Sequence, residues 1–171
     1  MTKIAIQPNA SGTGTFTIAA PNSNTNRTFT LPDATGEVYT SGNILGTVSQ
    51  DGGIPTGAII ERGSNANGDF VRYADGTQIC TSNFFITGSG TRLETTWVFP
   101  SQFVNADHVS NASVSNNGAN FDPTTLRDDL LRLFANTSPT VSGVNIGAIF
   151  SSSQADDSSF KVFVQAIGRW F

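Results

Sequence analysis

FVRYADGTQICT, residues 70–81, is the stretch that decides the fold of this chain. Its two halves, Phe70–Ala74 and Thr77–Thr81, are rich in β-branched and aromatic residues, which favour strands. Between them stands Asp75-Gly76, a pair typical of the two-residue type I′ turn, because both central residues of that turn need positive φ. The stretch therefore predicts an antiparallel β-hairpin.

Further strand patterns flank this hairpin on both sides. Runs of Val, Ile, Phe and Thr bounded by turn-forming residues predict strands at residues 57–61, 84–87, 95–99, 108–115, 141–150 and 160–167. One segment has a different period. Leu126, Leu130 and Phe134 recur every four residues after an Asp122-Pro123 start, which predicts a short helix over residues 123–135. We therefore expect a mainly β protein, with an antiparallel β-sandwich that carries one short helix.

The first fifty residues differ from the rest of the chain. They contain two Thr-Phe-Thr-aliphatic segments, at residues 15–18 and 28–31, which predict two short strands of an amino-terminal hairpin. An isolated hairpin buries too little apolar surface to be stable in water, so this one needs partners. The Gly-, Ser- and Asp-rich stretch Ser41–Pro55 is typical of a linker. We expect an attachment or shaft region over residues 1–50 and a carboxyl-terminal β-sandwich domain over residues 51–171.

Composition and charge exclude several classes of partner. Charged residues make up 13% of the chain, and the net charge is −4. A nucleic-acid-binding domain usually carries a basic face, so we expect no nucleic acid. No apolar run approaches the ~18 residues of a membrane span, so we expect no membrane insertion. The amino terminus lacks the apolar segment of a secretion signal, and a single cysteine forms no internal disulfide; both features predict synthesis in a reducing cytoplasm.

The sequence contains no recognisable enzyme constellation. His108 is the single histidine, no Gly-x-Ser-x-Gly elbow surrounds a serine, and His108 stands where a loop enters a strand, the ordinary place for a surface histidine. Cys80 fits a small buried hydrophobic residue rather than a zinc ligand. Asp156 and Asp157, in a Ser-rich stretch, favour a solvated loop, with calcium binding as the alternative. We expect no catalysis, no cofactor and no metal.

Two predicted loop tips are dense in amide side chains. The first contains Asn65 and Asn67, and the second contains Asn116, Asn117 and Asn120. Asn and Gly form turns because they tolerate the left-handed conformation, and this role accounts for both tips. The alternative is that the amides hydrogen-bond the hydroxyls of a sugar, which would make these tips receptor-contact loops.

Three aromatic residues are candidates for core or subunit packing. Trp97 and Phe99 lie on a predicted strand, so we expect both to be buried in the core or between subunits, with a platform for a sugar ring as the alternative for Trp97. Trp170 follows the strand predicted at residues 160–167, which we expect to be central to the sandwich. We therefore expect Trp170 to pack against the core or a neighbouring subunit, with a solvent-facing receptor contact as the alternative.

Four stretches resemble segments of bacteriophage and prophage tail-fibre proteins. Residues 57–80, GAIIERGSNANGDFVRYADGTQIC, resemble the opening of the carboxyl-terminal domain of these proteins. WVFPSQF at 97–103 and AIGRW at 166–170 are similar to later landmarks of that domain, and NRTFTLPDATG at 26–36 resembles a segment of fibre shafts. The resemblance implies a homotrimer whose distal β-sandwich, similar in outline to H-type lectin-like domains, contacts a glycan or protein on the host surface. The helix predicted over residues 123–135 departs from that all-β pattern.

These observations predict a structural protein of the virion. We expect a short trimeric tail fibre or spike that binds other virion proteins through residues 1–50 and attaches to the host surface. The alternative is a head fibre or decoration protein whose residues 1–50 hold the capsid, and a third interpretation is a carbohydrate-binding module without a role in the virion. A depolymerising tailspike is disfavoured, because such enzymes need a longer repetitive β-helix and paired carboxylates.

Overall fold

The computed structural model describes residues 10–15, 17–19, 21–31, 33, 38–115 and 130–171. The chain divides into two compact units, Met1–Glu37 and Val38–Phe171. In the first unit, none of the described residues belongs to a helix or a strand. The strands predicted at residues 15–18 and 28–31 are therefore wrong for the residues described there. Ile18, Phe29 and Leu31 are exposed, Phe29 by 82%, so none of these three side chains is packed in a way that would support a strand.

The second unit is mainly β, as the sequence predicts, and its described residues contain one short helix, which lies outside the segment 123–135 where a helix is expected. The helix α1 spans Ser41–Ile44 and is capped by the Thr40 side chain, which accepts from the Gly42 N–H. Among the described residues, the strands follow in chain order: β1 (Gln50–Asp51), β2 (Ile54–Pro55), β3 (Ile60–Asn65), β4 (Gly68–Tyr73), β5 (Thr77–Val98), β6 (Val109–Ser115), β7 (Leu130–Thr140) and β8 (Gly143–Arg169).

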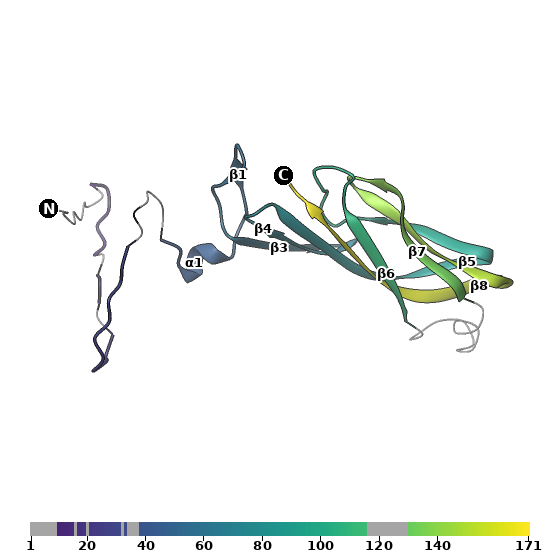
Figure 1. Ribbon diagram of the computed structural model, residues 1–171, viewed down its shortest axis with the longest axis horizontal. Coiled ribbons are helices and arrows are strands. Elements are labelled where there is room, and N and C mark those ends of the chain that lie inside the picture. The colour runs from purple at the N-terminus through teal and green to yellow at the C-terminus, as the bar shows by residue number, and fades with distance from the viewer. Residues whose placement is uncertain (1–9, 16, 20, 32, 34–37, 116–129) are drawn as a thin grey trace. The chain divides into compact units, whose positions relative to one another are not determined.

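Two long strands, β5 and β8, organise this unit (Figure 1). They pair antiparallel from Thr77 opposite Arg169 to Val98 opposite Gly143, with register shifts between Gly88 and Arg92. On one side of these shifts, the sheet runs in the order β3-β4-β5-β8-β6, and on the other side β7 pairs with β8. The strands predicted separately at 84–87 and 95–99, and at 141–150 and 160–167, are thus parts of two continuous strands.

The core lies where the two halves of these long strands face each other. Along the end of β8, Phe160, Val162 and Val164 are buried, whereas the alternating residues between them point outward. The rings of Phe150 and Phe160, which lie on opposite sides of the register shifts, are 5.9 Å apart. The strand predicted at 160–167 is central, as expected, since it pairs with β5 on one side and β6 on the other.

The turn between β4 and β5 differs from the predicted type I′ form. The Gly76 N–H donates to the Tyr73 carbonyl at 3.0 Å, and Gly76 has a φ of 93°, whereas Asp75 keeps a negative φ. This is the pattern of a three-residue hairpin loop, a turn followed by a residue in the left-handed region. The Thr77 N–H donates to Asp75 Oδ1 at 2.9 Å and thereby holds the pKa of that carboxyl below its ordinary value.

The segment Ser41–Pro55, expected to be a linker, packs against the sandwich instead. The Gly46 N–H donates to the Ile60 carbonyl at 2.9 Å, and the Ala58 N–H donates to the Thr47 carbonyl at 3.0 Å. Val48 is buried, and β1 and β2 pair with each other. The second compact unit, Val38–Phe171, includes this segment.

The predicted helix over residues 123–135 is wrong where the structure describes it. Leu130, Leu133 and Phe134 lie on β7, and Phe134 is buried opposite Gly147 of β8. A spacing of four residues is shared by one face of a helix and one face of a strand, so the period alone does not separate the two. Pairing with β8 decides for the strand. Residues 122–129 lie outside the described residues.

Candidate functional site

The first amide-rich tip holds the β3–β4 turn against the rest of the sandwich. Asn65 Nδ2 donates to the Pro100 carbonyl at 2.9 Å, and Asn65 Oδ1 accepts from the Asn67 N–H at 2.8 Å. The Asn67 carbonyl accepts from Trp97 Nε1 at 3.0 Å. These bonds are those of a structural turn, although the Asn67 side chain is exposed. Asn116, Asn117 and Asn120 lie outside the described residues.

Trp97 and Phe99 lie in a buried aromatic cluster. Trp97 is 3% exposed, and its ring meets that of Phe99 edge to face at a centroid distance of 5.0 Å. Phe103 continues the cluster at 5.0 Å from Phe99. A ring this deeply buried offers no open face on which a sugar could stack.

His108 belongs to the same cluster, and the surface position expected for it is wrong. It is 4% exposed and stacks on Phe103 with ring centroids 5.0 Å apart. Its Nε2 lies 3.0 Å from the Thr140 carbonyl, and its Nδ1 lies 3.2 Å from Ser110 Oγ. Packing against two phenyl rings, together with partners for both ring nitrogens, makes burial of this polar side chain tolerable.

Cys80 is fully buried, as a small hydrophobic residue would be. Its Sγ lies 3.5 Å from the Ser101 carbonyl, and burial raises the pKa of the thiol from 9.0 to about 11. Gln78 beside it donates from Nε2 to the carbonyls of Ser101 and Gln102, at 2.9 and 3.1 Å. These contacts fix the loop after β5 to the start of the same strand.

We expect the Cys80 thiol to resist a water-soluble disulfide reagent at pH 8 in the folded protein and to react within minutes in urea.

Because the pKa of the Cys80 thiol is raised, the folded state holds the proton more tightly than the unfolded state. The stability that this provides is present below about pH 9 and is lost as the pH rises through about 11. The free energy of unfolding, measured by urea titration, should therefore decrease less from pH 8.5 to pH 10.5 for Cys80→Ala than for the unmodified chain. Equal losses in the two proteins would contradict this account.

Trp170 is half-buried at the end of β8. Its Nε1 donates to the Tyr73 carbonyl at 2.9 Å, and its backbone N–H donates to the Gly76 carbonyl at 3.0 Å. The Arg72 guanidinium lies 5.5 Å from the ring centroid. Arg72 in turn donates to Gln78 Oε1 at 2.8 Å and to Ser101 Oγ at 2.6 Å. Trp170 thus closes a polar network that joins β4, β5 and the loop after β5.

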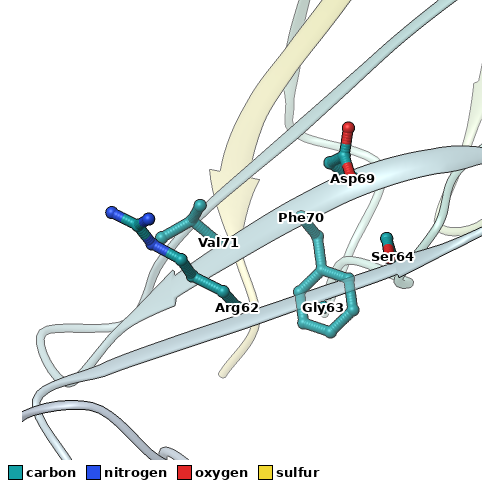
Figure 2. A pocket seen from close by; sticks show the side chains of 6 residues that line it. All are labelled: Arg62, Gly63, Ser64, Asp69, Phe70 and Val71. Atoms are coloured by element: carbon teal, nitrogen blue, oxygen red, sulfur yellow. The ribbon is translucent and has the colours of Figure 1, made fainter.

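A notch of about 420 Å³ lies on the β3–β4 hairpin. Figure 2 shows Phe70 and Asp69 leaving β4 in opposite directions, with the Phe70 ring crossing β3 at Gly63. A β-carbon at Gly63 would collide with that ring unless Phe70 moved. Since residues of both sheet faces line it, this hollow is an open notch at the sheet edge rather than an enclosed site.

Three more hollows lie around the outward-facing residues of β5 and β8. The first, of about 300 Å³, is bordered by Asn67, Asn83 and Phe85; the second, of about 310 Å³, by Asp69, Asn83 and Phe163. The third, of about 230 Å³, is bordered by Asn111, Phe163 and Gln165. Asn83 and Phe163 each border two of them. We call this surface the Phe163 face, made of Asn83, Phe85, Asn111, Ser113, Phe163 and Gln165.

Sequence reasoning did not single out the Phe163 face. The pattern that could have revealed it is the alternation in residues 160–167, where Phe163 stands in phase with Lys161 and Gln165. Of the residues predicted as receptor contacts, Asn67 borders one of its hollows. Asn65 is engaged at the turn instead.

Among the residues that the structure describes, no group of three His, Cys, Asp or Glu side chains comes close enough to hold a metal ion. Asp156 and Asp157, expected in a loop, lie within β8.

No helix among the described residues has the length and apolar character needed to cross a membrane. Comparisons with protein-family models, with curated proteins and with solved structures found no match to this chain.

Proposed function

We propose that this protein is a short trimeric fibre or spike of a bacteriophage virion that attaches to the surface of the host cell. The observation that carries the proposal is the exposure of Ile18, Phe29 and Leu31 in a unit whose described residues form no strand. Exposed apolar side chains in a repeated pattern are a liability for a monomer, and copies of the same segment would bury them. The resemblance of residues 26–36 to fibre shafts supports the same conclusion.

The second unit supports a display role. Its core joins strands far apart in the sequence through continuous pairing of β5 and β8, which gives a rigid support for a binding surface. Its exposed residues include many amides and hydroxyls and few charges, together with single apolar side chains such as Val109 and Phe163. In this proposal the first unit assembles and anchors the protein, and the second unit meets the receptor.

The assembly is tested by light scattering on the purified full-length chain. A trimer has three times the mass of the 18.0 kDa chain, and we expect that mass at micromolar concentration. The double variant Phe29→Ser/Leu31→Ser should lose it, while the melting of the second unit is unchanged. Val109→Ser, at an exposed apolar position of the second unit, is the matched control and should remain trimeric. A monomeric mass for the unmodified chain contradicts the proposal.

The place of attachment is tested by gold labelling of a carboxyl-terminal tag on intact particles that carry the protein. Labels at the tail support a tail fibre or spike. Labels distributed over the capsid shell would overturn the tail assignment in favour of a head fibre or decoration protein, and particles without label would overturn the virion role.

A further inference from the structure

The Phe163 face exposes two phenyl rings on the outer side of the sheet. Asn83 lies opposite Phe163, and Phe163 lies opposite Ser113 on β6; Phe85 lies opposite Lys161. Phe85 and Phe163 are therefore diagonal neighbours on one face, a placement that separates Cα atoms by about 7–8 Å. Each of these two residues is 47% exposed, although the neighbouring Ile86, Val162 and Val164 are buried in the core.

Hollows on both sides of the Phe163 ring give the face room for a ligand. Two of them, of about 230 and 310 Å³, border Phe163 itself. The one of about 300 Å³ borders Asn83 and Phe85 together with the inward-facing Phe84 and Trp97. The Phe163 ring therefore stands between two open depressions of the sheet surface. This arrangement suits a ligand with a ring-sized apolar face and polar groups around its edge.

The side chains around the rings define the chemistry of that ligand. Asn83, Asn111 and Gln165 each carry both a donor and an acceptor, and Ser113 adds a hydroxyl. Charge is sparse and balanced: Asp69 borders one hollow, and Lys161 Nζ lies 5.5 Å from the centroid of the Phe163 ring. Such a surface offers nothing to a polyanion or a strongly charged peptide, and it complements a neutral compound rich in hydroxyl and amide groups.

We propose that the Phe163 face binds a neutral glycan built of hexose or N-acetylhexosamine units. Phe163 packs against the apolar C–H face of one pyranose ring, and Phe85 packs against the next unit. The amides of Asn83 and Gln165 hydrogen-bond the ring hydroxyls. This inference rests on the proposed function, since it names the class of host receptor that the second unit recognises.

A panel of immobilised oligosaccharides tests the inference with the full-length protein. The panel contains neutral hexose and N-acetylhexosamine chains, sialylated chains and heparin. We expect binding to at least one neutral chain, with affinity reduced ~10-fold or more by Phe163→Ala and by Asn83→Ala, because central aromatic and hydrogen-bonding contacts dominate such surfaces. Phe163→Tyr keeps an aromatic ring and should keep most of the affinity. Val109→Ala, on the same sheet face four residues before Ser113, is the matched control and should bind within about twofold of the unmodified chain.

Three results would overturn the inference. The first is the absence of binding to every neutral chain, with or without binding to the charged ones. The second is equal binding by Phe163→Ala and the unmodified protein. The third is a loss of oligomer mass in Phe163→Ala, which would make this face a contact between copies of the chain. None of these results bears on Phe29, Leu31 or the labelled particles, so failure of the glycan site is distinguishable from failure of the proposed fibre.

Discussion

Trp97→Ala is expected to lower the free energy of unfolding by about 4 kcal/mol, a large part of the stability of a domain. The indole is almost completely buried, so its removal leaves a cavity beside Phe99 and loses the packing contacts of the ring. It also removes the hydrogen bond from Nε1 to the Asn67 carbonyl, which ties the β3–β4 turn to the second half of β5. Urea denaturation at a fixed protein concentration measures the difference.

Two variants separate the packing of Trp97 from its hydrogen bond. Trp97→Phe keeps most of the buried ring and loses the Nε1 donor, so we expect a cost of about 1–2 kcal/mol. Val98→Ala, at the exposed neighbouring position of β5, should cost less than about 1 kcal/mol. A similar loss in Trp97→Ala and Val98→Ala would show that the cluster around Phe99 does not stabilise the sandwich as we describe.

Trp170→Ala is expected to cost about 3 kcal/mol, less than Trp97→Ala because Trp170 is only half-buried. The substitution removes the bond from Nε1 to the Tyr73 carbonyl and the ring that lies beside the Arg72 guanidinium. It also frees the chain end after β8 from the β4–β5 turn. Thermal unfolding followed by circular dichroism should show a melting temperature lower by roughly 10 °C.

The same variant distinguishes packing from receptor contact at the carboxyl end. If Trp170 packs, Trp170→Ala melts earlier but binds the neutral glycan or host cells within about twofold of the unmodified chain, at a temperature below its transition. Trp170→Phe keeps a ring without the Nε1 donor, so its melting temperature should lie between those of Trp170→Ala and the unmodified chain. An unchanged melting temperature together with lost binding would assign Trp170 to the receptor surface and overturn the packing interpretation.

Local sequence was sufficient for features that depend on neighbours along the chain. The β class follows from runs of β-branched and aromatic residues separated by turn formers, and the alternation in residues 160–167 identified a central strand. The burial of Cys80 and Trp97 follows from their positions inside such runs. Each of these conclusions needs only the side-chain period of a strand and the cost of exposing an apolar group to water.

Tertiary structure decided whatever depends on pairing with residues far away. Gly88 and Gly90 interrupt local strand propensity, yet β5 continues through them because β8 supplies a partner about seventy residues later. Leu130 and Phe134 fit a helix and a strand equally well until β8 pairs with them. Likewise, Phe163 and Phe160 are chemically identical, and register alone places one outside and the other in the core. The candidate site could not be predicted from sequence for this reason: a one-residue difference in register exchanges the two faces of a sheet, and only pairing across the whole fold fixes that register.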